Sequence, residues 1–489
     1  MSDSALPVRT SGTSQATPRP ARSKWLALVI IALAQLTVVL DGTIVNVALP
    51  DAQAALGMSD SDRSWVVTLY ALAFGSLLLL GGRIADYWGR KRSFIVGMAG
   101  FALASGIGGL ATTGGMLLAA RGAQGVFAAL LAPAALAMLN VTFPKGPDRA
   151  KAFAVYGTIA GGGAAIGLVL GGVLTEYFSW HWCLLVNVPI AIVAIAMAIP
   201  ILTESKADGD TRYDVPGALL VTLGLGSIVY GFSRASLGWD RLDTIGFLAL
   251  GVALLVVFVL VEGRVSNPLL PLRVVANRVR GGAYITSLLV GAALLGGLLY
   301  LTLYFQIVLK FTPLHSGLSS LPMTASIIAG ATIVSRILPK VGPRILMTIG
   351  PVFAAGGLFW LSHLTVENEY FVQILPGQIL LGLGLAMVFV PMQNVALSGI
   401  EARDSGVGSA AVTATQQIGG SIGTAVFTAI YSSAVAAYVI ANPSQNPLPS
   451  LVSGYSSVFM AASITVLCAA PIAFILVNVK RRAFAGSQR

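Results

Sequence analysis

Charged residues are scarce in this chain, and their scarcity excludes an ordinary soluble fold. Asp, Glu, Lys and Arg make up 10% of the 489 residues, whereas a soluble protein carries about 25%. The hydrophobic fraction is 56%, and the mean hydropathy is +0.84. The apolar stretches are long and continuous rather than alternating, so they predict membrane-spanning helices and not a barrel. We therefore expect an all-α polytopic membrane protein.

Cysteine and histidine are also few. Cys183 and Cys468 both lie in apolar stretches, and the three histidines are scattered, which argues against a disulfide framework and against a metal centre. The sequence Gly-x-x-x-x-Gly-Lys-Ser/Thr is missing, so ATP is not expected to drive this protein. We expect no metal and no cofactor. Because no soluble segment is large enough for a catalytic domain, we do not expect an enzyme.

The two ends of the chain are polar. Residues 1–23 are rich in Ser, Thr and Pro and are expected to form a disordered tail. The first apolar stretch comes too late and runs too long for a signal peptide. Residues 479–489 are expected to form a short C-terminal tail.

Hydropathy predicts fourteen spans, and the basic residues of the loops alternate between the two sides of the membrane. We expect the spans to lie in the plasma membrane. The positive-inside rule, applied to this alternation, then places both termini in the cytoplasm. The net charge of +11 is then explained by the basic loops on the cytoplasmic side of the membrane, and we expect no nucleic-acid partner. The predicted spans are 25–49, 64–84, 93–113, 115–140, 151–175, 181–202, 215–233, 243–262, 281–309, 314–338, 344–364, 370–398, 405–432 and 455–478.

A faint internal repeat divides the chain. The segment Pro133 to Asn140 resembles Pro391 to Leu397, and each is followed by a short charged loop and a glycine-rich span. Such repeats are typical of transporters built from two halves. We expect six-helix bundles at 24–202 and 281–478, joined by a linker, 203–280, that carries the two remaining spans.

Asp41 is the carboxylate placed deepest in any predicted span. It belongs to the stretch Leu40 to Pro50, which ends the first span. A carboxylate at such a place costs about 2.5–3.5 kcal/mol on insertion scales and needs a reason to be there. Arg121 lies at a similar depth in the fourth span, about 10 Å from the same surface at 1.5 Å per residue. The two side chains are expected to pair, either as a static ion pair or as a switch governed by protonation.

Two further segments carry a pattern. The turn after the second span contains Gly82, Arg83, Asp86, Gly89, Arg90 and Lys91. It can be a plain basic turn, or a latch in which Asp86 pairs with Arg90 or with a helix N-terminus. The fifth span has glycines at helical spacing, for which close helix packing alone is a sufficient explanation; these are Gly163, Gly167, Gly171 and Gly172.

Together these segments are similar to the major facilitator superfamily, and in particular to its fourteen-span drug:proton antiporter branch. The resemblance covers about residues 25–480 and includes Trp180-His181-Trp182 and Asn187-Val188-Pro189 at the start of the sixth span. There are two departures. Leu168 follows Gly167 where the branch has Pro, which weakens the antiporter motif, and His181 stands where the branch commonly has Arg.

The resemblance implies a major facilitator fold with two six-helix bundles and two inserted helices, acting by alternating access. It also implies a monomer that exports small, largely apolar organic compounds, as in multidrug efflux and antibiotic resistance, in exchange for protons. Asp41 and Arg121 would serve proton coupling, the Gly82–Lys91 turn would be a conformational latch, and the glycines from Gly163 to Gly172 would form the antiporter motif. A proton-coupled importer and a non-transporting membrane scaffold remain as alternatives.

Polar and aromatic side chains within the spans are candidates for the substrate cavity, although each could instead face another helix or lipid. They are Gln35, Tyr300, Tyr304, Gln306, Gln393, Asn394 and Gln416. Glu176 and Glu262 lie at span ends, where interfacial positions in contact with lipid headgroups are expected. No second deep carboxylate is apparent near the first, and this predicts a substrate that is neutral or singly charged.

Overall fold

The computed structural model describes residues 21–144, 147–206, 213–235, 238–265, 268–367, 369–396, 398, 405–443 and 446–478. Almost all of the expected N-terminal tail, and the tail 479–489, lie outside these residues. Residues 21–23 already belong to the first helix.

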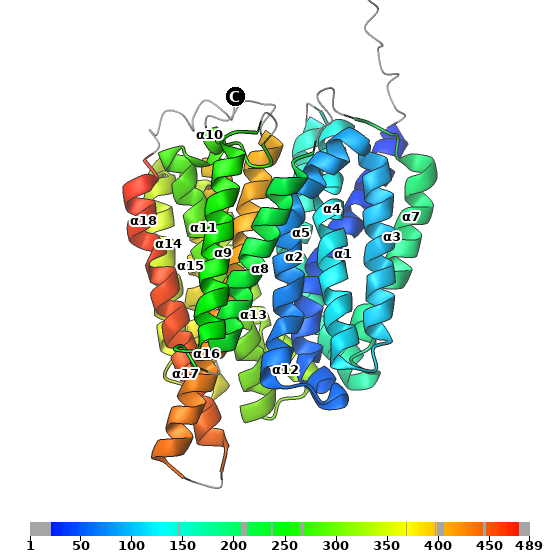
Figure 1. Ribbon diagram of the computed structural model, residues 1–489. Coiled ribbons are helices and arrows are strands. Elements are labelled where there is room, and N and C mark those ends of the chain that lie inside the picture. Colours follow the sequence, from blue (N-terminus) through cyan, green and yellow to red (C-terminus); the bar gives the residue numbers. More distant parts are fainter. Residues whose placement is uncertain are drawn as a thin grey trace, which may run out of the picture.

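All of the described secondary structure is helical (Figure 1). The first part of the chain forms α1 (Ala21–Leu56), α2 (Asp60–Trp88), α3 (Arg90–Gly109), α4 (Gly114–Thr142), α5 (Pro147–Tyr177), α6 (Trp182–Leu185), α7 (Asn187–Ile201), α8 (Val215–Arg234) and α9 (Leu242–Glu262). The second part forms α10 (Leu272–Val275), α11 (Arg278–Leu303), η2 (Tyr304–Val308), α12 (Pro313–Ser319), α13 (Leu321–Val341), α14 (Pro343–Leu361), η3 (Tyr370–Ile374), α15 (Leu375–Ala396), α16 (Ser405–Ala441), α17 (Leu448–Leu467) and α18 (Ala469–Leu476).

Fourteen helical segments of the described chain are long and apolar enough to cross a membrane, as the sequence predicted. Several are not single α-helices. The sixth span breaks at Val186 between α6 and α7, and the ninth ends in the π-helix η2. Hydropathy cannot detect such breaks, because a π-turn or a one-residue break leaves the apolar composition unchanged.

The ends of the last two spans were predicted wrongly. We expected 405–432 and 455–478, whereas α16 continues to Ala441 and α17 begins at Leu448. The two helices form a hairpin that projects beyond the rest of the bundle (Figure 1). Residues 433–441 are mostly Ala, Val and Ile, so the helix can continue past the length that a bilayer requires.

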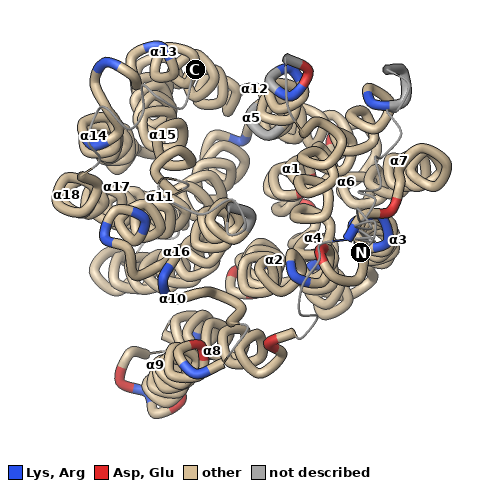
Figure 2. Tube along the Cα trace, turned by 90° about the horizontal axis from the view of Figure 1, so that it is seen from above, with Lys and Arg blue, Asp and Glu red and all other residues tan. Residues whose placement is uncertain are grey.

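The spans form two groups with the insert beside them (Figure 2). Helices α1 to α7 pack on one another, and α11 to α18 do the same. Of the inserted helices, α8 packs against α2 and α16, at the seam between the groups, while α9 packs chiefly against α8. We refer to the groups as the first and second bundles.

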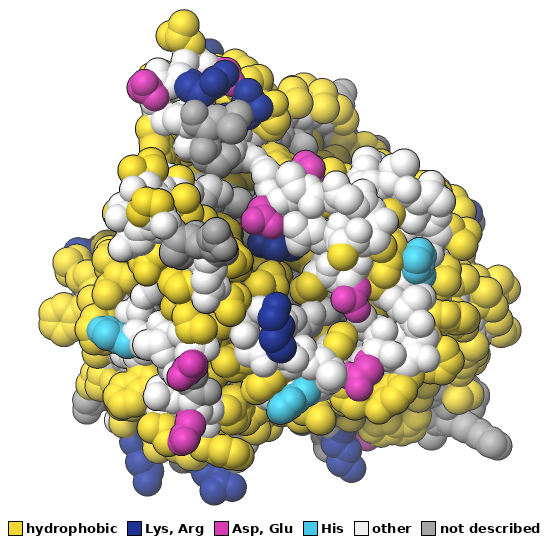
Figure 3. Space-filling model, turned by 90° about the horizontal axis from the view of Figure 1, so that it is seen from below, with side chains coloured by type: hydrophobic (Ala, Val, Ile, Leu, Met, Phe, Trp, Pro, Cys, Tyr) yellow, Lys and Arg dark blue, Asp and Glu magenta, His cyan; other side chains and the backbone are white. Residues whose placement is uncertain are grey.

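The two ends of the molecule differ. We call the end with the start of α1 and the α2–α3 turn the basic face, because Arg83, Arg90, Lys91 and Arg92 lie there. The other end is the opposite face, where charged side chains lie scattered among uncharged ones (Figure 3). This asymmetry is the property on which the predicted orientation depends.

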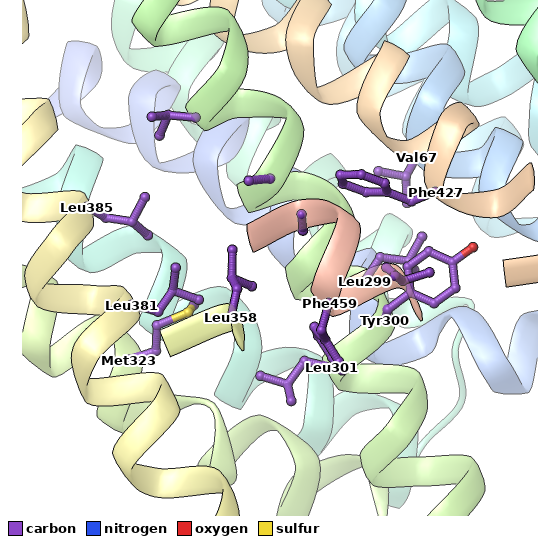
Figure 4. Close-up of a cluster of buried hydrophobic side chains, with 14 of the residues drawn as sticks. Val67, Leu299, Tyr300, Leu301, Met323, Leu358, Leu381, Leu385, Phe427 and Phe459 are labelled. Atoms are coloured by element: carbon purple, nitrogen blue, oxygen red, sulfur yellow. The ribbon is translucent and has the colours of Figure 1, made fainter. Parts of the chain in front are cut away.

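Among the described residues, the hydrophobic core that the bundles share lies mainly in the half near the opposite face. One cluster of buried side chains joins α1 and α2 to α11, α14, α15, α16 and α17, and Val67 of α2 lies beside Phe427 of α16 in it (Figure 4). The cluster in the basic half belongs chiefly to the first bundle, and from the second it includes the buried Ala414 and contacts the partly buried Ala410. The described bundles are therefore closed together at the opposite face.

Polar contacts reinforce this closure. Gln306 of η2 donates to the backbone oxygen of Val47 at 2.9 Å, and the backbone N–H of Leu314 donates to the Glu176 carboxylate at 3.0 Å. Glu176 was expected only to face lipid headgroups. Its contact with α12 shows that it also binds the second bundle.

Candidate functional site

A buried ion pair lies inside the first bundle. Arg121 of α4 donates through Nη1 to Asp41 Oδ2 of α1 at 2.6 Å. Asp41 is 0% exposed and Arg121 is 1% exposed. The equal depths inferred from helical rise thus correspond to direct contact in the structure.

Neutral side chains complete the surroundings of the carboxylate. Asp41 Oδ1 accepts from Gln124 Nε2 and from Asn187 Nδ2, both at 2.9 Å. The Ser105 hydroxyl accepts from the same Gln124 nitrogen at 2.7 Å. All four side chains are buried, so the carboxylate is bound by hydrogen bonds from two helices besides its own, α4 and α7, with α3 behind them.

Arg121 is held equally firmly. Its Nε donates to the backbone oxygen of Val66 on α2 at 3.1 Å, and its Nη1 donates to Gln124 Oε1 at 2.8 Å. The guanidinium carbon lies 4.4 Å from the centre of the Tyr70 ring, a cation–π geometry. A buried pair satisfied in this way offsets much of its desolvation cost.

Sequence reasoning missed the roles of three side chains of this network, Gln124, Ser105 and Asn187. Ser105 lies in a glycine-rich helix and carried no signal. Asn187 was noted only as part of the segment that opens the sixth span. A polar amide directly after a short apolar helix was the available clue, and its meaning depends on the packing of α7 against α1.

The arrangement can link protonation to helix position. Protonating Asp41 would remove its negative charge and leave the Arg121 guanidinium without a counter-ion in a low-dielectric interior, which is costly. Because Arg121 also binds α2 through Val66, any movement that relieves this cost involves α1, α2 and α4 together.

Three of the span-five glycines set the spacing between α5 and α1. A Cβ at Gly163 would lie 3.1 Å from Val39 Cγ1, one at Gly171 would lie 2.8 Å from the Ile44 oxygen, and one at Gly167 would overlap Thr43. Close approach of this kind requires glycine. The helix that carries Asp41 is thereby packed directly against α5.

Gly172 differs from these three. A Cβ there would lie 2.5 Å from Leu314 Cα, which belongs to α12 of the second bundle. One residue of the predicted motif thus contacts the other bundle, at the closed opposite face.

The turn after α2 contains the pair expected of the latch segment, Asp86 with Arg90. Arg90 donates to Asp86 Oδ1 at 2.8 Å. Gly89 has a φ of +129°, a conformation that favours glycine. Glu204 accepts from the backbone N–H groups of Lys91 and Arg92, both at 3.1 Å, and so caps the N-terminus of α3.

Other residues of the turn contact α7 and the linker. Lys91 Nζ donates to the Ile199 oxygen at 2.6 Å. Arg83 Nη2 donates to the Pro268 oxygen at 3.1 Å, which connects α2 to the linker after the inserted helices. A Cβ added at Gly82 would lie 3.6 Å from Pro133 Cβ, an ordinary packing distance.

Gly89→Val is expected to slow transport without changing the range of compounds transported. The new side chain would require a φ that valine avoids, and its Cβ would lie 2.6 Å from the Glu204 carboxyl carbon, displacing the cap of α3. Gly115→Val is the matched control, because a Cβ there meets nothing within 4 Å. Initial efflux rates for several compounds provide the measurement. A Gly89→Val protein with normal rates but an altered compound range would instead assign the turn to substrate recognition.

The cavity candidates fall into three groups. Tyr300 and Tyr304 are 1% and 0% exposed and pack against Tyr455, so in this conformation they are core residues. Gln35 accepts from the Tyr156 hydroxyl at 2.6 Å, and Gln306 joins the bundles as described above.

The remaining candidates are more accessible. Gln393 and Asn394 are exposed and Gln416 is partly buried. Asn394 donates to the Val390 oxygen of its own helix at 3.1 Å. Their contact with a substrate stays a prediction. In the described part of the chain, no group of three or more His, Cys, Asp or Glu side chains is placed to hold a metal ion.

The sequence matches a known protein family and named relatives. The family model described as Major Facilitator Superfamily matches residues 31–424. Puromycin resistance protein pur8 of Streptomyces alboniger is 43% identical over 486 residues, which cover 98% of this chain and 96% of that protein. The chain belongs to the major facilitator superfamily.

Other relatives of this major facilitator have similar names. The cephamycin export protein CmcT of Amycolatopsis lactamdurans is 38% identical over 85% of each chain. The tetracenomycin C resistance and export protein of Streptomyces glaucescens is 33% identical over 82% of this chain and 74% of its own. The fourteen spans fit the drug:proton antiporter branch of the superfamily.

Solved structures support the major facilitator fold. A bacterial homologue of the human lysosomal transporter Spinster, inward-facing and occupied, aligns with a TM-score of 0.66 at 14% identity, over 95% of this chain and 99% of that one. A bacterial homologue of the drug peptide transporters PepT1 and PepT2 aligns with a TM-score of 0.60 at 15% identity, over 94% and 99%. At such identity the likeness concerns the fold alone.

Proposed function

We propose that this major facilitator exports small, largely apolar organic compounds from the cytoplasm in exchange for protons, acting as a monomer in the plasma membrane. The observation that carries the proposal is the Asp41 carboxylate, buried at 0% exposure and bound to Arg121 at 2.6 Å. A titratable group in such a place is a candidate proton carrier. The names of the antibiotic resistance and export proteins among the relatives support the direction of transport.

The orientation follows from the charges. With the basic face toward the cytoplasm, both chain ends lie inside the cell, and the closed opposite face excludes the exterior. The described conformation is then the inward-facing member of an alternating-access pair.

The cycle uses the ion pair as its switch. Asp41 takes a proton that has entered from outside, its attraction to Arg121 weakens, and the bundles return to the inward-facing state. Release of the proton to the cytoplasm restores the pair as substrate binds, and this favours opening toward the outside. One charge moved across the membrane supplies about 2.3 kcal/mol per 100 mV.

Everted membrane vesicles distinguish this function from its alternatives. Adding a transported compound to energised vesicles should make protons leave the lumen as the compound enters. Proton movement in the same direction as the compound would indicate symport, and thus an importer. No compound-dependent flux across a broad panel would favour a non-transporting scaffold.

A dicationic compound is expected to be exported at least several-fold more slowly than a monocationic or neutral one. In the described bundles, Asp41 is the only fully buried carboxylate, and Arg121 already neutralises it. An unpaired charge in a low-dielectric interior costs several kcal/mol. Efflux of a monocationic dye, a neutral antibiotic and a dicationic biocide from the same cells measures this. Efficient efflux of the dication that is lost in Asp41→Asn would reveal an additional acidic site or a direct role of Asp41 in binding.

A further inference from the structure

Two acidic side chains meet at the basic end of the inserted helices. Asp214 immediately precedes α8, and Glu262 is the last residue of α9. They are 6% and 3% exposed. Glu262 was expected to lie at the membrane interface as an ordinary surface residue, and its burial corrects that prediction.

One oxygen of each carboxyl group has an identified hydrogen-bond donor. Asp214 Oδ1 accepts from the backbone N–H of Gly217 at 2.8 Å and caps α8. Glu262 Oε2 accepts from the backbone N–H of Leu270 at 3.1 Å. Gly217 is required here, because a Cβ at that position would overlap the Asp214 carboxyl group.

The other oxygen of each group has no donor among the described residues. These atoms are Asp214 Oδ2 and Glu262 Oε1, and both are shielded from solvent. Helices α8 and α9 pack on each other, and Tyr213 beside Asp214 and Pro268 in the segment after Glu262 both contact the end of α2, which places the two carboxyl groups next to each other. Such a contact requires a proton between them, because two ionised carboxylates offer only acceptors.

No described cation neutralises the pair. None of the ion pairs among the described residues includes Asp214 or Glu262. The charged and titratable groups of the adjoining elements are otherwise engaged or turned to solvent: Arg83 donates to Pro268 and to the Tyr87 hydroxyl, Tyr213 packs on Tyr87, and Arg264 is exposed.

We propose that Asp214 and Glu262 share one proton at neutral pH and so form a proton-binding site of their own, separate from Asp41. Two like charges this close in a buried setting cannot both be ionised at reasonable cost, so one group keeps its proton and donates it to the other. The ligand of this site is the proton itself. Proton binding at this site is independent of the direction and the substrate of transport.

The position of the site gives the shared proton a structural effect. Glu262 holds the linker after α9 through Leu270, and the neighbouring residue Pro268 accepts from Arg83 of the latch segment. With the proton bound, the carboxyl groups attract each other and the linker stays fixed against α2. Without it, their repulsion pushes α8 and the end of α9 apart and loosens that contact.

Infrared spectroscopy of the full-length protein in lipid nanodiscs tests the proposal directly. The carbonyl stretch of a protonated carboxylic acid is resolved from that of a carboxylate and shifts on exchange into D₂O. We expect the wild-type protein to show such a band at neutral pH and to lose it as the pH rises. Glu262→Gln and Asp214→Asn should each remove the same band, because each removes one partner of the shared proton.

The controls separate this site from others. Asp243→Asn changes an acid at the other end of α9 that is paired with Arg234 and Arg241, and it should leave the band unchanged. Asp41→Asn should leave it unchanged as well. Gel filtration checks the folding of each variant. One folded protein, with either Glu262→Gln or Asp214→Asn, is sufficient for the test. A wild-type protein without the band, or a band that survives in a folded Glu262→Gln or Asp214→Asn protein, would overturn the inference whether or not the protein proves to be an exporter.

Discussion

Asp41→Asn is expected to reduce proton-driven export to the level of cells without the protein. The substitution keeps the shape of the side chain but removes the group that binds and releases a proton. It also leaves Arg121, which is 1% exposed, without a counter-ion. Breaking a buried pair in this way costs about 3–5 kcal/mol, so a loss of thermal stability should accompany the loss of transport. Efflux assays and thermal unfolding of the purified protein measure the two effects.

A double variant separates these effects. In Asp41→Asn with Arg121→Gln neither charge of this pair remains, and we expect most of the lost stability to return while export stays absent. Asp51→Asn is the matched control, because Asp51 lies on the same helix but is exposed, and it should alter neither property. If the folded single or double variant drove active export at the wild-type rate, Asp41 would not be the proton carrier.

Gly172→Val is expected to abolish transport by preventing closure at the opposite face. The added side chain would begin 2.5 Å from Leu314 Cα and 2.9 Å from the Pro313 oxygen, and both are backbone atoms that cannot rotate away. Overpacking of this kind costs about 1–3 kcal/mol, which shifts the balance between closed and open states by roughly 5- to 150-fold. Because the clash lies between bundles, opening relieves it, and each bundle should keep its stability.

Distance measurements test this prediction. Spin labels at Phe178 and Leu318, which are 68% and 45% exposed, report on the separation of α5 and α12, and we expect a longer distance in Gly172→Val. Gly162→Val is the matched control on α5, since a Cβ there meets nothing within 4 Å. Gly167→Val provides a contrast, because its clash with Thr43 lies inside the first bundle and should lower stability instead. An unchanged label distance together with normal transport in Gly172→Val would show that this contact does not limit the cycle.

The proximity of Asp214 and Glu262 could not be predicted from the sequence. The two residues are separated by both inserted helices, and each on its own resembles a common residue at a span end. Their contact arises because α8 and α9 pack as an antiparallel pair, which brings the start of one to the end of the other. Hydropathy gives the lengths of such helices but not the rotation of each about its own axis, and rotation decides whether an end residue faces lipid or its neighbour.

The sequence by itself determined the properties that depend on position along a single helix. The fourteen spans follow from continuous apolar composition, and the common depth of Asp41 and Arg121 follows from a fixed rise per residue. Only the tertiary structure decided which helices meet. It brought Asn187 and Ser105 to Asp41, and it directed Gly172 at α12 while its neighbours on α5 face α1. These contacts join segments far apart in the chain, and they depend on how whole helices tilt, break and rotate against one another. Packing decides those features, because lipid tails and apolar side chains offer a helix nearly equal surroundings on every side.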